Sequence, residues 1–206
     1  NMKVNGLRMV KELKGVPCYG LELNSGRKKN ICTSRSFGME VKELKHLKEA
    51  VANHATMCAM KLRKEKSLAT SIMVFIKTNP FKNTDFQYNN AQKFTMKIPS
   101  SDSMEITKNA LLLLSRIYKK GYSYKKAGVI VSDIVPEGSR QLSLFINKDP
   151  LKVNHVMKAM DRVNQTMGRN KVRLAVQGFD RKWRLKQEKL SPCYTTRFSD
   201  IVTVKL

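Results

Sequence analysis

Residues 92–99, Gln-Lys-Phe-Thr-Met-Lys-Ile-Pro, alternate between apolar and polar side chains along almost their whole length. The two sets point in opposite directions: Phe94, Met96 and Ile98 on one side, and Lys93, Thr95 and Lys97 on the other. A period of two is typical of a β-strand that is buried on one face and solvated on the other. The segment therefore predicts a half-buried strand whose open face is cationic.

Similar alternation extends outward from this strand and predicts three more, over 30–38, 69–78 and 126–133. In 69–78, one face carries Ile72, Val74 and Ile76. Amphipathic patterns between the strands predict two helices, over 41–66 and 103–120. The order β-α-β-β-α-β favours an α+β fold, in which a four-stranded antiparallel sheet carries both helices on one face.

Apolar stripes at helical spacing identify the side chains that we expect to face the sheet. In the first helix the stripe is Leu44, Leu47, Val51, Ala55, Cys58 and Leu62. In the second helix it is Ile106, Ala110, Leu113, Leu114 and Ile117. Ser103 precedes this second stripe and is the expected N-cap.

The regions that flank this unit have a different character. Residues 1–14 contain a short helical stripe over 3–14, and residues 15–29 are a linker that ends in basic side chains. Residues 136–149 form a loop with Pro136-Glu137-Gly138-Ser139 at its start. Residues 150–206 predict a small α/β extension, with a helix over 151–167, a strand over 171–178 and a basic stretch around Trp183.

The charge of the chain is strongly unbalanced, with 40 Lys and Arg against 16 Asp and Glu, a net charge of +24. Such an excess is best tolerated beside a polyanion, and nucleic acid is the commonest one. An anionic membrane surface is the second candidate. No apolar run reaches the roughly 18 residues that a spanning helix needs, so we expect a soluble, cytoplasmic protein without a membrane partner.

Helices on one face of the sheet leave the other face free for a ligand. Lys77, Lys93, Lys97 and Arg35 are expected on or beside this open face. A solvated sheet surface explains these cations as well, but the net charge favours contact with phosphates. The face has few aromatic residues, and this argues against base stacking on RNA and favours the backbone of duplex DNA.

The residues that could carry catalysis or bind metal are scattered. Cys18, Cys32, Cys58 and Cys193 lack metal-ligand spacing and are expected to be buried free thiols, and His46, His54 and His155 are expected to be structural or surface residues. Asp85, Asp102, Asp133 and Asp161 have no acidic neighbour at catalytic spacing. We therefore expect no catalysis, metal or cofactor in this chain.

The pentapeptide Gln141-Leu142-Ser143-Leu144-Phe145 lies between a loop and a Pro-containing turn. It is either an amphipathic strand or a docking peptide. Its pattern is similar to the motif by which many DNA-handling proteins bind the bacterial sliding clamp. In such a motif Leu144 and Phe145 fill an apolar pocket and Gln141 provides a directional amide.

Several longer segments, in order along the chain, resemble the UmuC-like branch of the Y-family translesion DNA polymerases. CTSRSFG at 32–38 is similar to the CSRSFG of these proteins, and FIKTNPF at 75–81 to their FIKTSPF. KKAGV at 125–129 resembles QKAGV, and 191–200 resembles SPRYTTRSSD with Cys193 in place of the basic residue. The clamp-like pentapeptide falls where the family has QLNLF.

The resemblance implies that 30–135 is the little finger domain, 1–14 the end of the thumb, 136–149 a clamp-binding loop and 150–206 the UmuC-type extension. It implies a bacterial, nucleoid-associated protein of SOS-type DNA damage tolerance, whose magnesium-dependent palm lies outside this chain. Expected partners are primer–template DNA and the sliding clamp. The residues expected to contact DNA are Lys28, Lys29, Ser34, Arg35, Ser36, Lys77, Thr78, Lys93, Thr95 and Lys97.

A protein-interaction adaptor is the alternative. In that case residues 150–206 bind a UmuD-type accessory subunit or the recombinase filament. Trp183 could then lie at the docking surface, although an anchor in the core or between subdomains is the simpler interpretation of a single tryptophan.

Overall fold

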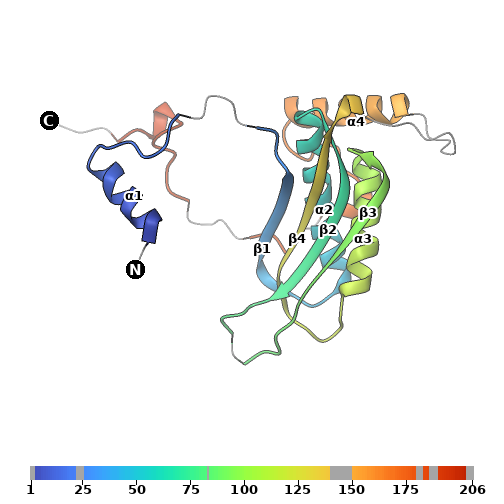
Figure 1. Ribbon diagram of the computed structural model, residues 1–206. Helices are drawn as coiled ribbons and strands as arrows, with labels where there is room; N and C mark the ends of the chain where they lie inside the picture. Colours follow the sequence, from blue (N-terminus) through green and yellow to red (C-terminus); the bar gives the residue numbers. More distant parts are fainter. Residues whose placement is uncertain are drawn as a thin grey trace.

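The computed structural model describes residues 3–21, 26–82, 84–139, 150–179, 183–185 and 190–202 (Figure 1). The helices are α1 (Lys3–Leu13), α2 (Leu44–Lys64), α3 (Ser103–Ile117) and α4 (Pro150–Thr166). The strands are β1 (Asn30–Val41), β2 (Ser67–Thr78), β3 (Asn89–Ser100) and β4 (Tyr124–Pro136). Short 3-10 helices follow at Glu137–Ser139, Ala175–Gln177 and Phe198–Asp200.

The four strands form one antiparallel sheet in the order β1-β4-β2-β3. Helices α2 and α3 lie together on one face of this sheet, and α4 lies across one end of the unit (Figure 1). The predicted β-α-β-β-α-β order and the α+β class are confirmed. The long β2–β4 pairing holds the centre of the sheet, with β1 and β3 at the edges.

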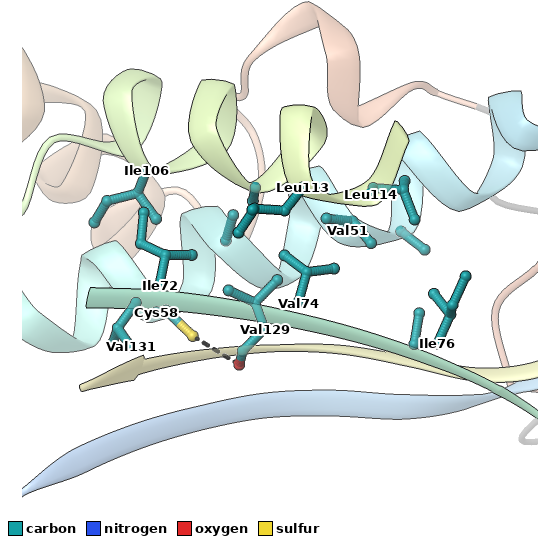
Figure 2. Packing of buried hydrophobic residues seen from close by; sticks show 14 of the residues in the cluster. Val51, Cys58, Ile72, Val74, Ile76, Ile106, Leu113, Leu114, Val129 and Val131 are labelled. Atoms are coloured by element: carbon teal, nitrogen blue, oxygen red, sulfur yellow. Dashed lines mark hydrogen bonds between the residues drawn. The ribbon is translucent and has the colours of Figure 1, made fainter. Parts of the chain in front are cut away.

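The core lies between the sheet and the two helices. Ile72, Val74 and Ile76 of β2 are completely buried, as the alternation predicts. Figure 2 shows them beneath side chains of α2 and α3, among them Val51, Ile106, Leu113 and Leu114. Burying one such aliphatic side chain contributes about 1.5–3 kcal/mol before the cost of ordering the chain.

The start of α3 differs from the prediction by one residue. The N-cap is Asp102, whose Oδ1 accepts a hydrogen bond of 2.9 Å from the backbone N–H of Met104. Ser103 is already helical and buried, and its hydroxyl oxygen accepts from Arg63 at 3.0 Å. A carboxylate is also favoured at a helix N-terminus, where it meets the positive end of the helix dipole.

An ion pair joins α4 to α2. The Arg63 guanidinium donates to both carboxylate oxygens of Asp161, at 2.6 and 2.8 Å, and also to the backbone carbonyl of Ser101 at 2.6 Å. Met157 and Met160, which precede Asp161 in α4, are also buried. The bidentate geometry fixes both the position and the orientation of α4.

The strand predicted over 171–178 is wrong, because this segment forms a bend and the 3-10 helix Ala175–Gln177. The completely buried Gln177 explains the difference. Its Oε1 accepts from the Leu174 backbone N–H at 2.8 Å, and its Nε2 donates to Asn53 of α2 at 3.3 Å. The segment is therefore tied to the helix layer and not to an edge of the sheet.

Trp183 anchors the extension to the sheet unit, with 5% of its surface exposed. Its ring lies edge-on to Phe37 of β1 and to His54 of α2, with ring centroids 6.2 and 6.3 Å apart. Its carbonyl accepts from the Gly38 N–H at 3.2 Å. The interpretation of Trp183 as a packing anchor is confirmed, and its buried ring does not serve as a docking surface in this conformation.

Candidate nucleic-acid interface

The strand register defines which side chains form the open face, the face of the sheet opposite to α2 and α3. We describe it as four cross-strand rows, each running from β1 through β4 and β2 to β3. The rows are Asn30–Ser132–Ser71–Thr95, Cys32–Ile130–Met73–Lys93, Ser34–Gly128–Phe75–Ala91 and Ser36–Lys126–Lys77–Asn89. Small polar side chains line the edges of this face, and two of its rows carry lysines.

The fourth row, hereafter the lysine row, brings two cations together. Lys77 of β2 pairs directly with Lys126 of β4, flanked by Ser36 and Asn89. Like charges at directly opposite positions destabilise a sheet. A bound phosphate would relieve that repulsion, so the lysine row is the strongest candidate for anion binding among the four rows of the open face.

A carboxylate that the sequence analysis did not assign to this face accompanies Lys93. Asp133 of β4 lies 3.1 Å from the Lys93 ammonium, and both side chains are more than half exposed. Its backbone is left-handed, with φ of 54°, a conformation that Asp tolerates better than most residues. Hydrogen bonding from Ser71, and then from Lys93, lowers the pKa of Asp133. Asp133 therefore opposes anion binding at Lys93.

The centre of the open face is packed closely around a glycine. A Cβ on Gly128 would come within 2.4 Å of the Phe75 ring and 2.5 Å of the Ser34 Cβ. Glycine at this position lets the Phe75 ring lie directly against the sheet. The middle of the face is therefore apolar and small, and the lysines lie around it.

The structure brings together five of the residues that we expect to contact DNA. They lie in the four rows: Ser34, Ser36, Lys77, Lys93 and Thr95. Lys97 is exposed and follows in an irregular part of β3, where the register shifts. Lys28 and Lys29 are exposed just before β1, and the Lys28 ammonium is bonded to Glu65.

Two expected positions need correction. Arg35 pairs with Ala127, which pairs in turn with the buried Ile76, so Arg35 belongs to the helix-covered side of the edge strand. The Thr78 side chain is 4% exposed, and its hydroxyl donates to Gln87 at 2.8 Å. Lys126 was missed, because only the register reveals that it lies next to Lys77.

The clamp-like pentapeptide at 141–145 lies outside the described residues. The structure describes the loop before it up to Ser139, where Glu137–Ser139 form a single 3-10 turn after β4. It describes the chain again from Pro150, where α4 begins.

Burial controls the titration of two side chains beneath the sheet. It lowers the pKa of His54 to about 4, with smaller contributions from the charges of Arg35 and Lys61. It raises the pKa of the Cys58 thiol to about 11. The expectation that all four thiols are buried is wrong: Cys58 is buried, Cys18 is intermediate, and Cys32 and Cys193 are exposed.

The part of the chain that the structure describes offers neither a metal site nor a membrane-spanning helix. Within that part, His, Cys, Asp and Glu do not gather in groups of three or more that could hold a metal ion. Its helices are also too short or too polar to cross a membrane.

Family models match two consecutive parts of the chain. The C-terminal domain of the impB/mucB/samB family matches residues 28–144, and a domain of unknown function, DUF4113, matches residues 154–204. The first match covers the whole four-stranded α+β sheet unit, from β1 to β4. The chain belongs to the impB/mucB/samB family.

Curated relatives support this assignment. Protein UmuC of Salmonella typhimurium (strain LT2) is 38% identical over 199 residues, covering 96% of this chain and 47% of the relative. Protein SamB of Salmonella typhimurium is 38% identical over 200 residues, covering 97% and 47%, and protein MucB of Escherichia coli is 36% identical over 201 residues, covering 96% and 47%. The chain spans about half the length of these relatives.

Two solved structures show weaker similarity. A complex of the β-clamp processivity factor with the little finger domain of PolIV has a TM-score of 0.38 at 14% identity, covering 57% of this chain and 99% of that one. The Y-family DNA polymerase chimera Dbh-Dpo4(243-245)-Dbh has a TM-score of 0.41 at 14% identity, covering 65% and 36%. The family assignment therefore depends on sequence.

Proposed function

We propose that this chain is the DNA-binding C-terminal region of an error-prone translesion DNA polymerase of the SOS type. In this proposal the open face binds the phosphate backbone of primer–template duplex, and residues 141–145 bind the sliding clamp. Polymerisation, with its magnesium ions, belongs to a part of the parent protein outside this chain.

The observation that carries the proposal is the lysine row. Lys77 and Lys126 lie opposite each other on the face that helices leave free, in a chain with a net charge of +24. The edges of this face carry small hydroxyl and amide groups, which can donate to phosphate oxygens without selecting a base. Binding through phosphates is independent of sequence, as a polymerase that moves along its template requires.

Charge reversal in the lysine row tests the duplex-binding part. The variant Lys77→Glu/Lys126→Glu should bind a blunt duplex at least about tenfold more weakly, and the slope of log affinity against log salt should flatten by roughly two units. The control is Lys45→Glu/Lys48→Glu, which makes the same charge change at exposed positions of α2.

The comparison separates contact with the open face from the general effect of net charge. Equal losses in the two variants would mean that only total charge matters and would contradict the assignment of the open face. Thermal unfolding of both variants provides the check that each remains folded.

The clamp part has a separate test. The double variant Leu144→Ala/Phe145→Ala should lose binding to the sliding clamp and keep its affinity for duplex DNA. Leu142→Ala is the control, because Leu144 and Phe145 are the expected pocket-filling anchors. Undiminished clamp binding by the double variant would show that the pentapeptide is not a docking motif.

A further inference from the structure

The connection between β2 and β3 displays two phenylalanines to solvent. Phe81 is 92% exposed and Phe86 is 89% exposed. The described parts of this connection, residues 79–82 and 84–88, project from one end of the sheet, at the lower edge of the view in Figure 1. Two large rings in one loop that are almost fully solvated lose the stabilisation that burial would give, and exposed apolar surface gathered in one place often marks a contact surface.

The side chain of Gln87 holds this loop in shape. Its amide nitrogen lies 3.0 Å from the carbonyl oxygen of Asn79, 2.9 Å from that of Lys82 and 3.2 Å from that of Asp85. Its Oε1 accepts from the hydroxyl of Thr78. A single amide therefore organises the loop from inside, and the two rings are presented on a preformed support.

The charges within the loop are paired with one another. The Lys82 ammonium lies 2.8 Å from the Asp85 carboxylate and 3.4 Å from that of Glu40. Lys82 hydrogen bonding lowers the pKa of Asp85, so this carboxylate remains ionised and paired. Consequently the acidic groups near the rings are compensated and do not strongly repel an anionic ligand.

The base of the loop is anchored by tyrosines at the same end of the sheet. The Tyr88 ring lies 4.9 Å from that of Tyr122, and its hydroxyl donates to the carbonyl of Ile117 at 2.7 Å. The Lys119 ammonium lies 5.2 Å from the centre of the Tyr88 ring. This end of the molecule therefore combines a rigid base with additional positive charge.

The loop begins where the lysine row ends on the open face. The lysine row ends β2 on the open face, because Lys77 and Asn89 are the last paired residues before the connection. A nucleic acid whose phosphates occupy the lysine row would reach the loop next. A base that is not paired there offers a flat π surface to an exposed ring, while its own phosphate stays near the lysines.

We propose that Phe81 and Phe86 form a stacking site for unpaired nucleotide bases, where single-stranded nucleic acid leaves a duplex held on the open face. The site rests on the proposed duplex-binding function and adds a single-stranded segment to its substrate. Stacking on aromatic rings tolerates every base, so the site requires no particular sequence.

The test compares two DNA probes and two variants of the full chain. One probe is a blunt duplex, and the other is the same duplex with a single-stranded 5′ overhang. Phe81→Ala/Phe86→Ala should bind the overhang probe about fivefold or more weakly and leave blunt-duplex affinity within twofold, because each stacked base contributes at least about a fivefold gain. Phe81→Tyr/Phe86→Tyr keeps both rings and should retain the wild-type affinity for both probes.

A fluorescent base provides a second readout. 2-Aminopurine in the overhang should be quenched by the wild-type chain and by the tyrosine variant, and not by the alanine variant. If the alanine variant binds and quenches the overhang like the wild type, the stacking site is overturned, and a protein becomes the better candidate for contact with the rings. If the wild-type chain fails to bind even the blunt duplex, the duplex-binding function fails, and the stacking site fails with it.

Discussion

Ile72 and Met73 are consecutive residues of β2, and they face opposite surroundings. Ile72 is completely buried beneath α2 and α3, among aliphatic side chains of the neighbouring strand and of the helices. Met73 is only half-buried, on the open face, where it pairs with Lys93. One face of the sheet therefore supplies the stability of the fold, while the other carries charge that the fold itself does not need.

The difference shows how one sheet can serve two purposes. A substitution on the covered face disturbs the packing of the core. Side chains on the open face can include two opposed lysines, because the core on the other face stabilises the domain sufficiently.

Truncation on the covered face should be the most damaging change. Ile72→Ala should lower the free energy of unfolding by about 2–5 kcal/mol, since it leaves a cavity beneath the helices. Met73→Ala, one residue away on the open face, should cost clearly less. Urea denaturation of both variants measures the difference, and similar losses would contradict the division of the sheet.

Acid should lower the stability of the fold through His54, which is buried on the covered side of the sheet. Its pKa is about 4 in the folded chain against an ordinary 6.5, so the folded state keeps the imidazole neutral. As the pH falls from about 6.5 towards 4, the unfolded state gains this proton first. The free energy of unfolding should therefore decrease by roughly 3 kcal/mol as the pH falls across this window. Above pH 6.5 this destabilisation by His54 should be absent.

The variant His54→Leu tests this assignment. Among the described residues, neither ring nitrogen of His54 has a hydrogen-bond partner, so an apolar replacement breaks no hydrogen bond there. The variant should unfold with a flatter dependence on pH between 6.5 and 4. If the variant and the wild type show the same dependence, other groups cause the acid sensitivity.

Removing the acidic group from the open face should have the smallest effect, and in the favourable direction. Asp133→Asn frees Lys93 from its carboxylate partner and should raise affinity for duplex DNA about two- to fivefold, as expected for the loss of an exposed ion pair. Glu12→Gln on α1 makes the same charge change away from the sheet. An equal gain in both variants would assign the effect to net charge alone.

The strands and the core could be predicted from local alternation. In the alternation of 30–38, Ile31, Thr33 and Arg35 fall on one side of the strand, and the structure shows that Ile31 is buried and that Arg35 lies on the same side. The expectation that Arg35 lies at the open face followed from its charge and not from its position in the pattern. For Arg35, the alternation of side chains indicates the correct face of the sheet, and the charge does not.

Other features depend on contacts between distant residues. The pairing of Lys77 with Lys126 requires the register of β2 and β4, which no local pattern specifies. The segment 171–178 has strand-like alternation, but the amide of Gln177 binds both its own turn and Asn53 of α2. Asp133 reaches Lys93 through a left-handed backbone that its sequence neighbours do not indicate.

Alkylation of Cys32 shows whether duplex DNA covers the open face, because this exposed thiol lies on that face, in the row of Ile130, Met73 and Lys93. Exposed Cys193 provides a comparison outside the sheet, and the raised pKa and burial of Cys58 keep that thiol unreactive in the folded chain. Binding of duplex DNA should slow the modification of Cys32 in proportion to the fraction of protein bound. If Cys32 reacts at its free rate when the duplex is saturating, DNA does not bind this face.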